Sequence, residues 1–176
     1  LIGSFAGHIV HDKQIFEALY HPETKAFLTE EENAFIERHV PRTVFLNDQD
    51  IDLEEICSNK DAWIIKPTDN YGARDVYAGL SYSQSEWEEL IQRFANEASG
   101  APFIAQTYKT HTLAPDTHIE ELNDDDIDLQ GKWYNNLNGL YLYNGEFQGI
   151  FSRLGPLPTI SKEHQGMTAA TLHVRG

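Results

Sequence analysis

The stretch from Trp63 to Gly79, which reads WIIKPTDNYGARDVYAG, decides the fold of this chain. Residues 63–65 are apolar and rich in β-forming side chains, and Val76 and Tyr77 begin a second run of the same kind. Between the two runs stand Pro, Asp, Asn and Gly residues, which accept tight turns and left-handed backbone. The stretch therefore predicts a strand, a turn-rich loop and a second strand.

Two cationic residues lie in this predicted hairpin: Lys66 ends the first strand, and Arg74 lies in the loop. The backbone N–H groups of such a loop can bind a polyphosphate, while the lysine neutralises part of its negative charge. It differs from the G-x-x-x-x-G-K-[ST] phosphate loop, because the lysine precedes the glycine and no helix follows directly. The alternative is an ordinary surface hairpin in which Arg74 pairs with Asp69 or Asp75.

Composition limits the classes of function. With 176 residues, 40% of them hydrophobic, the chain is long enough for one globular domain or two small lobes. A formal net charge of -15 argues against a nucleic-acid or membrane partner but not against a nucleotide, which needs only a few local cations. No apolar run approaches the roughly 20 residues that span a bilayer. Cys57 is the single cysteine, so no internal disulfide forms, and we expect a cytoplasmic protein.

Start and stop signals divide the chain into three segments. Residues 1–60 form a helical segment that leads into the fold, in which Thr29 begins a capping-box helix. Residues 61–100 form a strand–loop–strand–helix lid, whose helix at residues 86–98 follows Ser85. Residues 101–176 form a sheet lobe.

The sheet lobe begins with a buried strand predicted at residues 102–108. An acidic insertion follows at residues 114–130, and we expect it to be solvated. The turn Asn144-Gly145 joins β-rich runs at residues 137–143 and 147–153, which is the strongest short-range signal of a hairpin.

Three of these segments carry a family resemblance. Residues 64–67 followed by 70–73 are similar to a phosphate-covering strand and glycine-rich loop, residues 102–106 to a strand that enters an adenine hinge, and residues 138–153 to a late hairpin that ends in an arginine. Because of the order and spacing of these segments, the chain resembles the C-terminal portion of ATP-grasp proteins. Within that superfamily it is most similar to the circularly permuted group that includes glutathionylspermidine synthase.

The resemblance implies an α+β fold, with an ATP-grasp-like antiparallel sheet, helices on one side and a small hairpin lobe. It also implies a carbon–nitrogen ligase that uses ATP to activate a carboxylate as an acyl phosphate, which an amine then attacks. Arg153 would stabilise the transferring phosphoryl group or the acyl phosphate. The ATP-binding residues would be Lys13 and Lys66 at the phosphates, Asn70, Tyr71, Gly72, Ala73 and Arg74 above them, and Gln106, Thr107 and Tyr108 beside the adenine.

The chain also departs from the family pattern. Its loop has one glycine, Gly72, where these loops usually have two or three. The magnesium ligands of the permuted members lie upstream of the matched region, so we expect Mg²⁺ to be held outside this segment, by the upstream remainder of the protein. On this interpretation the segment alone is inactive. The alternatives are a non-catalytic ATP-grasp-like binding module, and an unrelated α+β interaction domain whose acidic insertion docks a basic partner.

Overall fold

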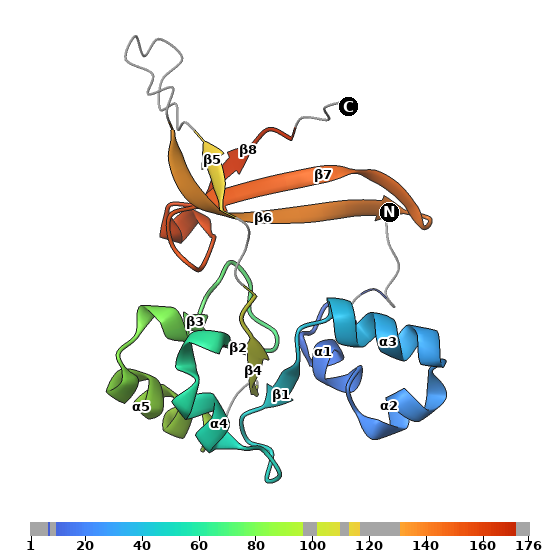
Figure 1. Ribbon diagram of the computed structural model, residues 1–176, viewed down its shortest axis with the longest axis vertical. Coiled ribbons are helices and arrows are strands. Elements are labelled where there is room, and N and C mark those ends of the chain that lie inside the picture. The colour runs from blue at the N-terminus through green and yellow to red at the C-terminus, as the bar shows by residue number, and fades with distance from the viewer. Residues whose placement is uncertain (1–6, 8–9, 97–101, 110–112, 117–130, 172–176) are drawn as a thin grey trace. The chain divides into compact units, whose positions relative to one another are not determined.

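The computed structural model describes residues 7, 10–96, 102–109, 113–116 and 131–171. The chain divides into two compact units, Leu1–Lys109 and Thr110–Gly176 (Figure 1). Both units contain antiparallel β-sheet, and the first also carries the α-helices, so the chain is an α+β protein. Among the described residues, no helix combines the length and the apolar character needed to cross a membrane.

The first unit holds five α-helices and four strands among its described residues. In chain order these elements, with two short 3-10 turns, are α1 (Gln14–Ala18), α2 (Pro22–Phe27), α3 (Glu30–His39), β1 (Thr43–Phe45), α4 (Leu53–Ser58), η2 (Lys60–Ala62), β2 (Trp63–Pro67), β3 (Tyr77–Ala78), η3 (Gly79–Ser81), α5 (Gln84–Ala95) and β4 (Phe103–Thr107).

The sheet of the first unit has the strand order β1-β4-β2-β3, and every neighbouring pair is antiparallel. Helices α4 and α5 pack on one face of it and form the core there (Figure 1). Trp87 on α5 is fully buried, and its indole N–H donates to the Ile56 carbonyl on α4 at 3.1 Å. The remaining buried core residues are Leu46, Trp63, Ile65, Ile91, Phe94 and Ala105.

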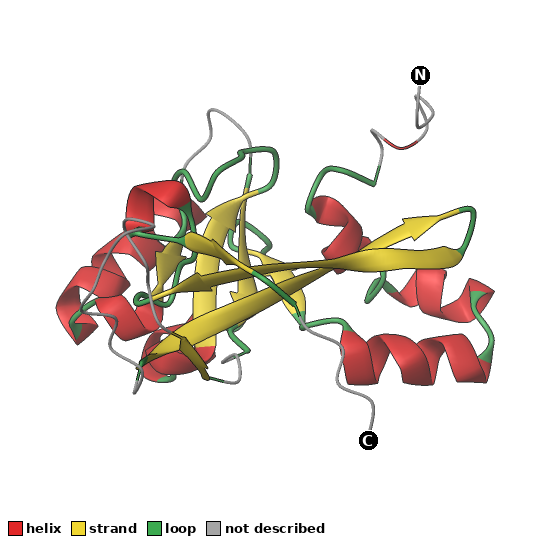
Figure 2. Ribbon diagram, turned by 90° about the horizontal axis from the view of Figure 1, so that it is seen from above, coloured by secondary structure: helices red, strands yellow, loops and turns green. Residues whose placement is uncertain are grey.

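The second unit is built on a long hairpin of β6 (Lys132–Tyr143) and β7 (Glu146–Gly155) (Figure 2). Its turn residues Asn144 and Gly145 both have positive φ, at 51° and 79°, as an Asn-Gly hairpin turn requires. The predicted hairpin is therefore confirmed, and β6 begins earlier than expected. The shorter strands β5 (Ala114–Asp116) and β8 (Met167–Ala169) pair with β6 and β7, and a 3-10 turn, η4 (Lys162–His164), precedes β8.

Several elements begin or end away from their predicted residues. Helix α5 begins after Ser83 rather than Ser85, and α2 has Pro22 as its first residue. Strand β4, predicted within the sheet lobe of residues 101–176, pairs with β1 and β2 of the first unit. Most of the acidic insertion, residues 117–130, lies outside the described residues, as do residues 97 and 98 of the predicted helix.

The two capping boxes of the first unit explain where α3 and α5 begin. Thr29 and Ser83 each accept a hydrogen bond from a glutamate N–H three residues later, while that glutamate carboxylate accepts from the capping residue's own N–H. The same bonds hold the pKa of Glu32 and of Glu86 below the ordinary value. The box at Thr29 confirms the prediction made from its sequence.

Removing the α5 cap is expected to weaken the first unit. Ser83→Ala should lower the free energy of unfolding by about 1 kcal/mol, because an N–H at the helix start loses its acceptor. Urea unfolding followed by circular dichroism measures the difference. Ser85→Ala is the matched control, two residues along and exposed, and it should change stability by less than about 0.5 kcal/mol. A larger effect at Ser85 would contradict the assigned cap.

Candidate functional site

The alternation of β2 and β4 places Lys66 and Gln106 on the same face of the first sheet. Trp63 and Ile65 point into the core under α4 and α5, so the side chains between and after them point to the opposite face. In the β2–β4 register Ile64 lies opposite Gln106, and Lys66 is therefore its diagonal neighbour. The two polar side chains meet away from the hydrophobic core.

A chain of hydrogen bonds fixes the Lys66 amine in this position. Lys66 Nζ donates to Gln106 Oε1 at 2.6 Å, and Gln106 Nε2 donates to Thr43 Oγ1 at 2.8 Å. The Thr43 hydroxyl in turn donates to the Pro41 carbonyl at 2.9 Å. Gln106 and Thr43 are only 7% and 1% exposed, so this chain is shielded from water. The order of donors determines that the amide presents its oxygen to the lysine.

The electrostatic state of Lys66 is unusual. Burial, followed by the positive charge of Lys13, lowers the pKa of Lys66 from 10.5 to about 8. Its Nζ lies 6.0 Å from the centre of the Phe16 ring, on α1. Within the described ranges, no carboxylate forms an ion pair with this lysine. The positive charge of Lys66 therefore interacts with an amide oxygen and an aromatic ring, and Lys66 remains available to bind an anion.

Lys13 ties the start of α1 to the loop that follows β2. Its Nζ donates to the carbonyls of Thr68 at 3.1 Å and Asn70 at 2.8 Å, and its backbone N–H donates to Thr68 at 3.0 Å. Burial lowers the pKa of Lys13, and the nearby carboxylates of Asp12 and Asp69 partly oppose that shift. The structure thus brings Lys13 and Gln106, from two other segments of the sequence, together with Lys66 and Asn70 of the stretch from Trp63 to Gly79.

The loop between β2 and β3 has the backbone that its sequence predicts. Gly72, Ala73 and Asp75 have positive φ, at 65°, 61° and 55°. Asn70 Nδ2 donates to the Asp75 carboxylate at 3.0 Å, which closes the loop across its base. The side chains of Tyr71 and Arg74, at the tip of this loop, are exposed. The centres of the Tyr71 and His11 rings are 4.6 Å apart.

The end of β4 uses its own backbone donors within the protein. The N–H of Thr107 donates to the Arg42 carbonyl at 2.9 Å, and that of Tyr108 donates to the Ala62 carbonyl at 2.7 Å. Burial raises the pKa of the Tyr108 hydroxyl. An adenine beside this strand would therefore meet side chains and carbonyl oxygens rather than these two N–H groups.

Arg153, the residue expected to act on the phosphoryl group, belongs to the second unit. It lies on β7, where its backbone is paired with Leu137 of β6 and Thr168 of β8, and its side chain is exposed. The two lysines and Gln106 lie in the first unit.

Sequence reasoning missed two threonines that complete the site. Thr43 anchors the Gln106 amide, and Thr68 supplies a carbonyl to Lys13. Thr68 is 1% exposed, and its hydroxyl oxygen has no hydrogen-bond partner among the described residues. Its position directly after Lys66-Pro67 was a usable signal. No sequence signal connected Thr43 to Gln106, which is 63 residues away.

No cluster of three or more His, Cys, Asp or Glu side chains that could hold a metal ion occurs in the part of the chain that the structure describes. Magnesium was expected to be held outside this segment, and that expectation stays a prediction.

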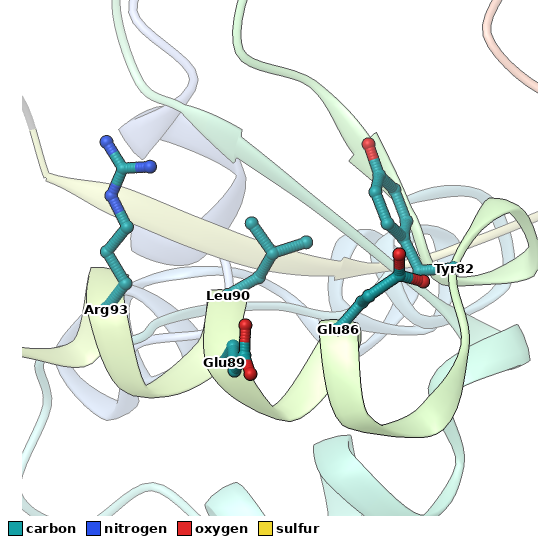
Figure 3. Close-up of a pocket in the computed structure, with 5 residues that line it drawn as sticks. All are labelled: Tyr82, Glu86, Glu89, Leu90 and Arg93. Atoms are coloured by element: carbon teal, nitrogen blue, oxygen red, sulfur yellow. The ribbon is translucent and has the colours of Figure 1, made fainter.

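A separate hollow lies on the outer surface of α5 (Figure 3). It has a volume of about 290 Å³, and Tyr82, Glu86, Glu89, Leu90 and Arg93 line it. Glu86 is already engaged in the capping box with Ser83. None of the predicted site residues contributes to this lining, so it is distinct from the lysine site.

No model of a known protein family matches this sequence, and no curated protein matches it.

Proposed function

We propose that the Leu1–Lys109 unit binds the phosphates of ATP through Lys13 and Lys66, as the nucleotide-binding part of an ATP-grasp-type carbon–nitrogen ligase. The observation that carries this proposal is the lysine pair. Two amines from distant segments lie close enough for one to lower the pKa of the other, and the more buried one has no carboxylate partner among the described residues.

Placing two like charges together has an energetic cost that an anion relieves. A unit charge about 4 Å from a phosphate charge gains on the order of 4 kcal/mol at an effective dielectric constant near 20. Each hydrogen bond to a charged oxygen adds roughly 1.5–3 kcal/mol. Strongly shifted pKa values of this kind are common at functional sites. A bound polyphosphate would satisfy both Lys13 and Lys66 and return the Lys66 pKa toward its ordinary value.

The surrounding residues support the same assignment. The loop at residues 70–74 has left-handed positions and an exposed tip, a geometry that can turn N–H groups toward an anion. Gln106 accepts a hydrogen bond from Lys66, so we assign it a role in positioning Lys66 for the phosphates. Thr107 and Tyr108, at the end of the same strand, are the proposed neighbours of the adenine.

The reaction class is inferred from the resemblance. The γ-phosphate would activate a carboxylate as an acyl phosphate, which an amine would then attack. The role that the resemblance gives to Arg153, which lies in the Thr110–Gly176 unit, stays a prediction. The α+β architecture with antiparallel sheets is compatible with an ATP-grasp fold.

Calorimetric titration with ATP and magnesium tests the proposal on the whole chain. Lys66→Met should weaken ATP binding about 30-fold, equivalent to roughly 2 kcal/mol, because one charge-assisted contact is lost while the shape is kept. ATP should also raise the melting temperature of the wild-type chain, since it binds the folded state.

Lys25→Met provides the control, because Lys25 is a lysine of the same unit that pairs with Glu37 on the surface. Its substitution should leave the ATP affinity within twofold of the wild-type value. Absence of ATP binding by the wild-type chain, or equal affinities in Lys66→Met and Lys25→Met, would contradict the assignment.

A further inference from the structure

We propose that Lys66 is an acyl-acceptor residue, whose neutral amine attacks the carbonyl carbon of a small acyl phosphate held by Lys13 and becomes acylated. This inference rests on the proposed function, because Lys13 binds a phosphate group in both. It adds a covalent reaction of the chain itself, which the binding of a nucleotide does not require.

The hydrogen-bond chain orients the amine for such an attack. Thr43 fixes the Gln106 amide, and the amide oxygen accepts one N–H of Lys66. That bond persists in the neutral amine, which still has N–H donors, so the lone pair is directed away from Gln106. Lys66 as a whole residue is half-buried, and no described carboxylate pairs with it, so its reaction would break no ion pair among the described residues.

Burial, followed by the positive charge of Lys13, keeps a useful fraction of the Lys66 amine neutral. With a pKa of about 8, roughly 9% of Lys66 is neutral at pH 7, against about 0.03% for a lysine at 10.5. Part of this roughly 300-fold gain is lost, because nucleophilicity falls as basicity falls, as is known for thiols. The charged group that acts on Lys66 is Lys13, at the start of α1, while Asp12 and Asp69 act on Lys13 itself. Gln106, Thr43 and Phe16, which face Lys66 from β4, β1 and α1, are uncharged.

The step balances without any further reagent. The Lys66 nitrogen forms a bond to the acyl carbon, and the bond from that carbon to the phosphate oxygen breaks with its electron pair passing to the phosphate. Inorganic phosphate leaves, and the nitrogen releases a proton to the phosphate or to water. The product is an amide with no positive charge, so acylation would remove one of the two cations that bind phosphate.

Acetyl phosphate is the probe for this reaction. The whole chain is incubated with it at pH 7–9, and the rate of acetylation at each lysine is measured by peptide mass spectrometry. We expect Lys66 to be acetylated about tenfold faster than Lys25, an ordinary surface lysine, with a rate that levels off above about pH 8. Lys13→Met should slow the Lys66 reaction, since it removes the phosphate anchor. Acetylation of Lys66 no faster than that of Lys25 would overturn the inference.

ATP titration of the same sample separates this inference from the proposed function. Selective acetylation of Lys66 in a chain that does not bind ATP would support the acyl-acceptor role and refute the nucleotide site. ATP binding without selective acetylation would do the reverse.

Discussion

Replacing Trp87 with alanine is expected to lower the free energy of unfolding of the first unit by about 4–6 kcal/mol. Removing a buried aromatic side chain costs roughly 3–5 kcal/mol, because transfer energy is lost and a cavity remains. The Trp87 indole also satisfies the Ile56 carbonyl, and leaving that acceptor unpaired adds at least about 1 kcal/mol. Native domains are stable by only about 5–15 kcal/mol, so much of this unit should unfold. Urea unfolding of the whole chain, followed by circular dichroism, measures the loss.

Two further variants distinguish packing from hydrogen bonding at this site. Trp87→Phe keeps a buried ring but loses the bond to Ile56, so we expect an intermediate loss of about 1–3 kcal/mol. Trp133, which is 67% exposed on β6, serves as the matched control, and Trp133→Ala should change stability by less than about 0.5 kcal/mol. Similar losses of unfolding free energy in Trp87→Ala and Trp133→Ala would show that the core does not depend on the packing of α5.

The start of α5 shows how far local sequence patterns reach. Ser83 and Ser85 each precede a glutamate by three residues, Glu86 and Glu88, so both match the capping-box pattern. The sequence analysis placed the cap at Ser85, which was wrong, because the pattern alone does not distinguish the two starts. The structure begins the helix at Ser83, and Trp87 reaches its buried position from that start. Tertiary packing therefore decided between two locally equivalent caps.

The turn of the second-unit hairpin and the strand on each side of it could be predicted, because their signals are local, although β6 begins at Lys132 rather than at residue 137. Asn144 and Gly145 supply the positive φ values of the turn, and the β-rich runs follow directly on both sides. The contact between Lys66 and Gln106 has a different origin. It depends on the register between two strands about 40 residues apart, and on Thr43 in a third strand, and no short-range pattern encodes that register.

The Lys66 pKa makes a further prediction about stability. Lys66 has a lower pKa in the folded chain than in the unfolded chain, so the unfolded state binds more protons between about pH 8 and 10.5. Stability should therefore rise with pH across this window. Below pH 8 the charged amine costs the folded state about 3 kcal/mol, since each unit of pKa shift corresponds to 1.36 kcal/mol. Near pH 9.5 this cost has fallen to roughly 1.4 kcal/mol.

Lys66→Met removes this dependence and isolates the contribution of Lys66. Burial also shifts the pKa of Cys57 and of Tyr77, but those shifts are shared by both chains and cancel in the comparison. The variant leaves the Gln106 oxygen without its donor at every pH, which moves the whole curve without changing its slope. Between pH 7 and pH 9.5 the free energy of unfolding of the wild-type chain, measured with urea, should therefore rise by about 2 kcal/mol relative to that of the variant. Parallel curves would mean that Lys66 titrates as an ordinary lysine, and the electrostatic basis of the anion site would then be lost.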